Sequence, residues 1–195
     1  MAILHDAISS ETQLSESRFS NLLAGGKYQL FAFGPDQDVQ GFALLYFSTQ
    51  FRFAWLDYFA VRADLRGRGL GSELFRETVQ LARTRESIPD WLLFEVDDDY
   101  EGDTQRQKDC IRRIRFYQRL GARVLENVPY KFPSASAPPV GMRLMAYQLN
   151  TAARLVPDDV KDAVREIFIN IHGRSTDDQL LRWFEESLPK SIEMK

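Results

Sequence analysis

The sequence predicts an α+β fold with a mixed, mostly antiparallel central sheet flanked by helices. Three observations lead to this prediction. Three strand-like runs follow one another through short turns within residues 27–61. The third run leads through a turn rich in glycine and arginine into an amphipathic helix, and a fourth apolar run follows that helix. Strands joined by tight turns and then interleaved with helices are typical of an α+β or mixed-sheet domain.

The first part of the predicted sheet is an antiparallel meander. A strand is expected over Tyr28–Phe33, and the residues Gly34–Asp38 supply a turn. The second and third strands are expected over Val39–Ser48 and Phe51–Val61, which are rich in aromatic and branched residues. Upstream, the spacing of apolar residues in Thr12–Leu23 predicts a helix.

The segment after the third strand combines a tight turn, Arg62–Gly71, with a helix over Ser72–Arg83. The helix is predicted because its apolar residues recur at steps of three and four. The first amides of a helix have no acceptor inside it, and the helix dipole makes that end positive. Glycine lets the backbone come close to a ligand. A strand, such a turn and a helix together predict a cradle for an anion, most often a phosphate.

Other phosphate-binding loops do not fit this turn. A Walker A loop ends in Gly-Lys-Ser/Thr, which is missing, and this disfavours a nucleotide-binding switch. A dinucleotide fingerprint needs a third glycine where Ser72 or Leu74 stands. The pattern that does fit is Arg-x-x-Gly-x-Gly over Arg66–Gly71. A helix N-terminus with a glycine-rich turn and no ligand stays open as the plainer interpretation.

The second half of the chain continues with alternating elements. Trp91–Val96 is a compact apolar run typical of a buried strand, and Gln105–Leu120 has a helical pattern. Val124–Val128 and Met142–Leu149 are expected to form a closing hairpin. Two amphipathic helices are expected after Pro157.

Length and pattern divide the 195 residues into a main domain, residues 1–150, and a C-terminal helical extension, residues 151–195. The extension has an apolar face that must be covered by the domain or by a partner subunit, so a homodimer is left open.

Composition narrows the class of protein. A net charge of −3 gives no indication of nucleic-acid binding. The single cysteine, Cys110, excludes an internal disulfide and is typical of a reducing compartment. No apolar stretch is long enough to span a membrane, and the first residues do not resemble a signal peptide, so a cytoplasmic protein is expected. Two histidines and one cysteine far apart in sequence predict no metal site.

Two motifs carry a family resemblance. Arg66–Gly71, placed between a strand and a helix, and Phe116–Ala122, about fifty residues later, resemble the two signatures of the GNAT acyltransferase superfamily. The resemblance covers about residues 15–150 and implies an acetyl-CoA-dependent N-acetyltransferase. It implies acetyl-CoA or a similar acyl-CoA as co-substrate, and a small-molecule or peptide amine as acceptor. One departure is Cys110, where family members often carry an asparagine that binds pantetheine, so no pantetheine contact is assigned to this helix.

The same resemblance assigns roles to residues. The loop amides would hold the coenzyme pyrophosphate, a backbone amide of the preceding strand would polarise the acyl carbonyl, and Tyr117 would protonate the leaving thiolate. Alternatively, Tyr117 only packs within its helix. Two carboxylates, Glu95 and Asp57, are open candidates for the general base. The expected coenzyme-binding residues are Phe59, Ala60, Val61, Arg66, Gly67, Arg68, Gly69, Leu70, Gly71 and Ser72.

Three interpretations stay open. The acidic stretch Asp97–Asp103 is either a solvated loop or a negative rim that attracts a cationic amine. The proline-rich connection Pro129–Gly141 borders the acceptor pocket in acyltransferases of this fold, which makes Tyr130, Phe132 and Pro133 candidates for its lining. The alternative to an enzyme is a non-catalytic module that binds CoA or another protein and keeps the fold.

Overall fold

The structure, a computed structural model, describes residues 20, 23–85, 87–98, 104–134 and 138–195. Most of the helix predicted over Thr12–Leu23 lies outside these residues. The chain divides into two compact units, Met1–Leu92 and Leu93–Lys195, and each is considered by itself. Among the described residues, no helix has the length and apolar character that crossing a bilayer requires.

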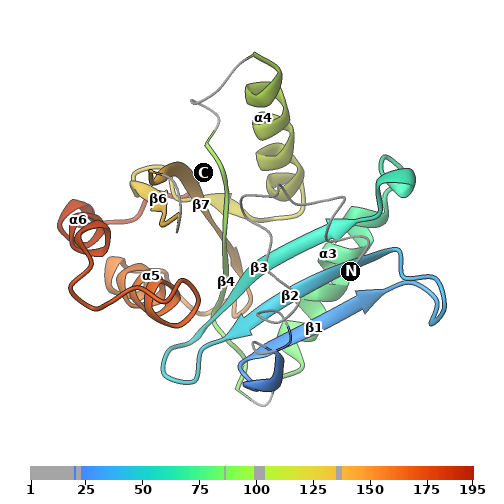
Figure 1. Cartoon of the computed structure of the whole chain (residues 1–195), viewed down its shortest axis with the longest axis horizontal. Coiled ribbons are helices and arrows are strands. Elements are labelled where there is room, and N and C mark those ends of the chain that lie inside the picture. Colours follow the sequence, from blue (N-terminus) through green and yellow to red (C-terminus); the bar gives the residue numbers. More distant parts are fainter. Residues whose placement is uncertain (1–19, 21–22, 86, 99–103, 135–137) are drawn as a thin grey trace. The chain divides into compact units, whose positions relative to one another are not determined.

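The first unit contains the predicted antiparallel meander. Its strands are β1 (Tyr28–Phe33), β2 (Gly41–Phe47) and β3 (Phe53–Val61), which lie side by side in Figure 1. Tyr28 pairs with Tyr46, which in turn pairs with Trp55. All three strands were predicted, and β2 and β3 are shorter than expected by one or two residues at their ends because the turns take those residues.

A β-bulge interrupts the pairing of β2 with β3. Leu44 pairs with Tyr58, but the next residue, Leu45, pairs with Leu56, so the ladder skips Asp57. Bulges bend a strand, redirect side chains and are frequent next to active sites. Asp57 is therefore the extra residue of the bulge, and its orientation does not follow from the alternation of side chains along the strand.

One face of the meander is covered by α3 (Leu70–Arg83). The ring of Phe75 lies 6.0 Å from that of Phe59, and Leu74 lies against Gly41, where an added Cβ would be 3.1 Å from it. Since side chains alternate along a strand, Tyr28 and its neighbours on the other face point away from α3. A short 3-10 helix, Ala63–Leu65, connects β3 to the loop.

The second unit carries β4 (Trp91–Asp97, beginning two residues before the boundary), β5 (Arg123–Val124), β6 (Tyr130–Phe132) and β7 (Val140–Gln148). The strands β5 and β6 both pair antiparallel with β7. Its helices are α4 (Thr104–Arg119), α5 (Pro157–Asn170) and α6 (Gln179–Ser187). Strands and helices in this order confirm the predicted α+β class.

The closing hairpin differs from the prediction. The strand expected over Val124–Val128 is reduced to β5, and the expected loop Pro129–Gly141 contains the strand β6. The strand was not predicted because prolines in this segment favour an irregular loop. Pro129 and Pro133 in fact only flank β6, and proline next to a strand is compatible with its pairing.

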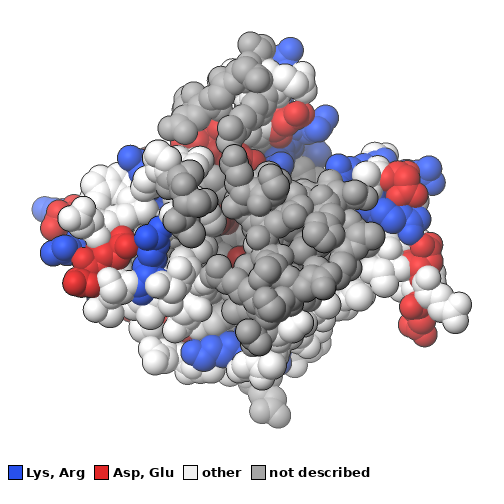
Figure 2. Space-filling model, viewed as in Figure 1, with Lys and Arg blue, Asp and Glu red and all other residues white. Residues whose placement is uncertain are grey.

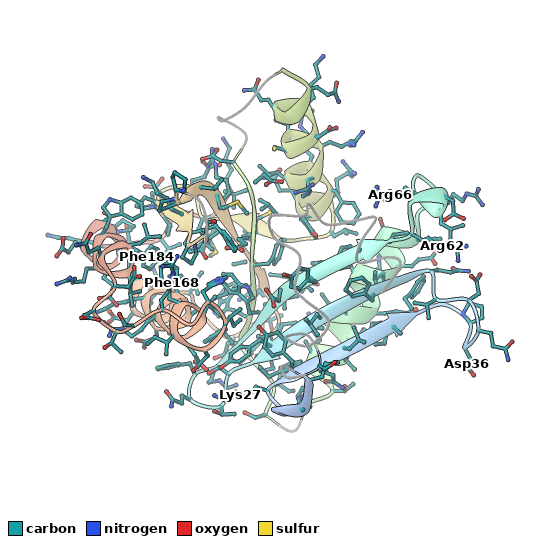
Figure 3. The ribbon with its side chains drawn as sticks, in the orientation of Figure 1. Lys27, Asp36, Arg62, Arg66, Phe168 and Phe184 are labelled. Atoms are coloured by element: carbon teal, nitrogen blue, oxygen red, sulfur yellow. The ribbon has the colours of Figure 1, made fainter. Side chains whose placement is uncertain are left out.

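The two C-terminal helices pack on β6. The ring of Tyr130 lies 6.3 Å from that of Phe168 in α5 and 6.1 Å from that of Phe184 in α6. Figure 3 labels Phe168 and Phe184 on these two helices. The chain end is also bound, because Val124 and Lys195 exchange two backbone hydrogen bonds of 2.9 and 3.0 Å. The apolar faces of the extension thus cover the second unit itself, while the division at residue 150 stays a prediction.

Candidate functional site

The loop before α3 has the backbone of an anion cradle. Gly67 and Gly69 have φ of 79° and 88°, and Gly69 is the N-cap of α3. The helix begins at Leu70, two residues earlier than predicted, because Gly69 makes the left-handed turn that starts it. No Cβ at either position would meet an atom within 4 Å, so the space beside both glycines is open. Glycine is required here by backbone conformation, and the adjoining space can hold a ligand.

The amides of this loop are available to a ligand. Within the described part of the chain, the amides of Gly67, Arg68, Gly69, Leu70 and Gly71 donate to no acceptor. The first amides that donate are those of Ser72 and Glu73, both to the carbonyl of Gly69. Five successive donors at a helix N-terminus form a positive concave surface suited to phosphate oxygens.

The arginines around the loop divide into two kinds. Arg62 donates to Asp64 at 2.8 Å and to Asp38 at 2.5 Å, and its guanidinium lowers the pKa of both carboxyls. Figure 2 shows these opposite charges side by side at the end of the unit where Figure 3 labels Arg62 and Arg66. Arg62 therefore fastens the loop to the turn between β1 and β2.

Arg66 and Arg68 are differently placed. Arg66 donates through Nε to the carbonyl of Val61 at 3.1 Å, which ties the loop back to the end of β3. Its terminal nitrogens and the whole Arg68 guanidinium make no hydrogen bond or ion pair with the other described residues. Both predicted arginines can thus add charge to the cradle.

Tyr117 lies in the interior of the second unit. Its side chain continues a buried stripe of α4 with Cys110 and Ile114, and its ring lies 4.7 Å from that of Phe94 in β4. Burial raises the pKa of Tyr117 to about 12, and the charge of Arg113 opposes this shift. The hydroxyl is therefore fully protonated at neutral pH.

The two aromatic residues of the second motif differ in burial. Tyr117 is buried, while Phe116 is only half-buried. Cys110, Ile114 and Tyr117 follow the i, i+4, i+7 spacing of a buried helical face. The tyrosine is thus part of the core stripe as well as a candidate for chemistry.

The two candidate bases have different surroundings. Glu95 is half-buried in β4, and because Phe94 faces Tyr117, strand alternation directs Glu95 to the opposite side of β4. Asp57 is half-buried at the bulge of β3 and accepts a hydrogen bond of 3.0 Å from the hydroxyl of Tyr28. No local sequence pattern joins Tyr28 to Asp57, because 29 positions separate them, so Tyr28 is a contact that the sequence does not predict.

The start of the acidic stretch is bound by arginines. Asp97 pairs with Arg113, and Asp98 pairs with Arg143 at 3.3 Å. Arg143 also pairs with Glu126 at 3.2 Å. The negative charges of Asp97 and Asp98, the first two residues of the expected negative rim, are therefore each paired with an arginine. The remaining part of that prediction falls on residues 99–103, which lie outside the described residues.

The residues expected to line an acceptor pocket contact residues of the C-terminal extension. Tyr130 is only 3% exposed, which makes it a core residue. The ring of Phe132 lies 5.0 Å from His172. Arg174 donates to the backbone carbonyl of Pro133 at 3.0 Å. Residues 135–137 of this connection lie outside the described part of the chain.

A cavity of about 700 Å³ lies elsewhere in the first unit. Its lining includes Lys27, Phe47 and Thr84, and none of the predicted site residues. Phe47 ends β2, whereas Gly41 at the other end of β2 pairs with Val61 next to the loop, so the cavity and the loop occupy opposite ends of the meander. In the described residues, no group of three or more potential metal ligands of the His, Cys, Asp and Glu types comes together.

The chain is similar to known acetyltransferases. The family model described as Acetyltransferase (GNAT) family matches residues 4–122. A Bacillus subtilis (strain 168) protein named "Putative acetyltransferase YjbC" is 28% identical over 152 residues, which are 77% of this chain and 70% of that protein.

Solved structures show the same fold. A GNAT-family protein of Bacteroides thetaiotaomicron matches with a TM-score of 0.72 at 18% identity, over 89% of this chain and 90% of that one. A GNAT family acetyltransferase of Elizabethkingia anophelis, solved with acetyl-CoA bound, matches with a TM-score of 0.52 at 15% identity, over 75% of this chain and 88% of that one.

Proposed function

This chain belongs to the GNAT family of acetyltransferases, and from that premise we propose that it moves an acetyl or other acyl group from acyl-CoA to an amine. The acceptor is a small molecule or a peptide. The observation that supports this most directly is the run of five available amides from Gly67 to Gly71 at the start of α3. Such a run has no structural use inside the helix, and it suits the pyrophosphate of the coenzyme.

The residues present fit this coenzyme. The open space beside Gly67 and Gly69 lets phosphate oxygens approach the backbone. The α3 dipole and the two arginines Arg66 and Arg68 favour negative charge there. The remaining predicted contacts, from Phe59 to Val61, belong to the end of β3 that leads into the loop. When bound, the coenzyme supplies an acyl group activated as a thioester.

Tyr117 is the proposed donor to the sulfur that leaves. Its raised pKa of about 12 lies well above the ordinary pKa of a thiol, which is about 8.5. Moving the proton completely to a thiolate would be uphill by roughly 3.5 pKa units, or about 5 kcal/mol. A neutral hydroxyl that donates a strong hydrogen bond to developing negative charge avoids this cost. Tyr117 is therefore proposed to stabilise the thiolate by hydrogen bonding before protonation is complete.

The proposed transfer is direct, with no acyl-enzyme. The chain has one cysteine, Cys110, which is buried in α4 beside the Tyr117 stripe and is not placed as an exposed nucleophile. Asp57 and Glu95 remain the proposed alternatives for removing the proton from the amine.

The test combines binding and turnover. Acetyl-CoA at one hundred times its Kd should stabilise the protein by about 2.7 kcal/mol, and raise Tm by roughly 5–10 °C, whereas ATP and NAD should not. A screen of amine acceptors with detection of released CoA thiol then measures transfer. Stabilisation by acetyl-CoA with no thiol release from any amine would support the non-catalytic CoA-binding module instead. No stabilisation by acetyl-CoA would refute the assigned cradle.

A further inference from the structure

At the bulge, β3 becomes partly exposed to solvent. From Phe53 to Leu56 every side chain is at most 5% exposed, and Ala60 is 5% exposed. Between them, Asp57, Tyr58 and Phe59 are half-buried. A carboxylate beside such a buried strand is stable only if hydrogen bonds or opposite charges compensate its lost hydration.

Tyr28 supplies such a hydrogen bond from two strands away. Its hydroxyl donates to Oδ2 of Asp57 at 3.0 Å. Since β2 lies between β1 and β3, and neighbouring strands are about 4.8 Å apart, the two side chains and their hydrogen bond together span roughly 10 Å of sheet. A long, rigid side chain with a terminal donor meets this requirement, which tyrosine does and phenylalanine does not.

The tyrosine is itself held in place. It is 7% exposed, and its ring meets that of Tyr46 edge to face at a centroid distance of 5.3 Å. Burial, followed by the charge of Asp57 and their hydrogen bond, raises the pKa of Tyr28 far above its ordinary value, with smaller contributions from Tyr58 and Tyr46. The hydroxyl therefore keeps its proton and stays a donor, which favours the ionised form of Asp57.

We propose that Tyr28 is a positioning residue that holds Asp57 ionised at the bulge, so that this carboxylate binds the ammonium group of a cationic amine acceptor. The inference rests on the proposed acyl transfer and narrows its acceptor class to amines that are positively charged when they bind. A fixed carboxylate at the half-buried bulge of β3 pairs with an ammonium ion, and the adjacent aromatic ring of Tyr58 can add a cation–π contact. The assignment concerns recognition of the acceptor and adds no proton-transfer step.

The main test is Tyr28→Phe, which removes the donor and keeps the ring. KM for a cationic primary amine should rise roughly tenfold, as expected for loss of a hydrogen bond to a charged group. KM for acetyl-CoA, and KM for an aromatic amine that is neutral at the assay pH, should stay at the wild-type values. Tyr46→Phe is the matched control, because it removes a hydroxyl from the neighbouring buried ring and leaves the hydroxyl of Tyr28 in place.

A second measurement does not depend on turnover. In wild-type protein labelled with ¹³C at aspartate carboxyls, the resonance of Asp57, assigned through Asp57→Asn, should titrate at lower pH than in Tyr28→Phe. If Tyr28→Phe does not fold, Asp57→Asn must show the same selective rise in KM for the cationic amine.

The outcomes separate the two proposals. Equal KM for the cationic amine in wild type and in both variants, with normal turnover, would overturn the role of Tyr28 and Asp57 and leave acyl transfer standing. If Tyr28→Phe raises KM for the cationic amine and KM for the neutral amine by the same factor, the contact between Tyr28 and Asp57 is only structural. A wild-type protein that releases no thiol with any amine would overturn the proposed function and this inference with it.

Discussion

Substitution of Gly69 by alanine gives a sharp test of the coenzyme cradle. Gly69 has φ of 88° and is the N-cap from which α3 starts. A Cβ at this position meets no atom within 4 Å, so the substitution introduces no clash in the free protein. Its effect comes from the backbone alone, because an alanine in the left-handed region costs about 1–2 kcal/mol.

This strain energy limits both the loss of stability and the loss of affinity for acetyl-CoA. If the backbone keeps its conformation, the free energy of unfolding falls by about 1–2 kcal/mol, which lowers Tm by roughly 2–8 °C in a chain of this length. If the backbone instead relaxes to negative φ, the amides from Gly69 to Gly71 turn away, and coenzyme binding must restore them. Affinity for acetyl-CoA then falls by at most the same energy, which is about 5- to 30-fold.

A matched control separates strain from loss of the cradle. Gly26 has φ of 72°, and a Cβ there also meets no atom within 4 Å, but it lies outside the loop. Gly26→Ala should keep the wild-type affinity for acetyl-CoA, whereas strain that Gly69→Ala does not show as a loss of Tm should appear as weaker acetyl-CoA binding in titration calorimetry. If Gly69→Ala keeps both the wild-type Tm and the affinity of Gly26→Ala for acetyl-CoA, the reasoning that the Gly69 amides bind the coenzyme is refuted.

Three further predictions follow from the second unit. Tyr117→Phe should lower kcat by roughly 10- to 100-fold with little change in KM for acetyl-CoA, measured by thiol release; an equal fall in coenzyme affinity would contradict a role confined to the leaving sulfur. Because the folded-state pKa of Tyr117, about 12, lies above the ordinary value of 10, its stabilising contribution is complete below pH 10 and is lost as the pH rises towards 12. The free energy of unfolding of the wild type, measured with urea, should therefore fall by up to about 3 kcal/mol relative to that of Tyr117→Phe over this pH range. Unfolding free energies that change in parallel with pH in the two proteins would contradict the raised pKa of the buried hydroxyl. Arg143→Ala should destabilise by about 1–3 kcal/mol, since its side chain is 12% exposed and bridges Asp98 and Glu126, whereas Arg112→Ala, with a side chain 80% exposed, should change unfolding by less than about 0.5 kcal/mol.

Local patterns were enough to predict most elements and the position of the glycine-rich loop. The meander from Tyr28 to Val61, the helix α3 and its glycine-rich start all depend on short-range effects: alternation, helical spacing and the backbone freedom of glycine. The boundaries were less accurate, since Gly69 rather than Gly71 ends the loop, and β6 lies in a segment that its flanking prolines made look irregular.

By itself, then, the sequence determined the α+β class, the order of its described strands and helices apart from β6, and the position of a positive loop between β3 and α3. Tertiary structure alone decided which carboxylate and which hydroxyl meet, because the register of two strand pairs brings Tyr28 to Asp57. It also decided how readily Tyr117 gives up a proton, because that depends on the surface it loses to water when α4 packs. Register and burial are properties of contacts between distant segments, and no stretch of residues specifies them alone.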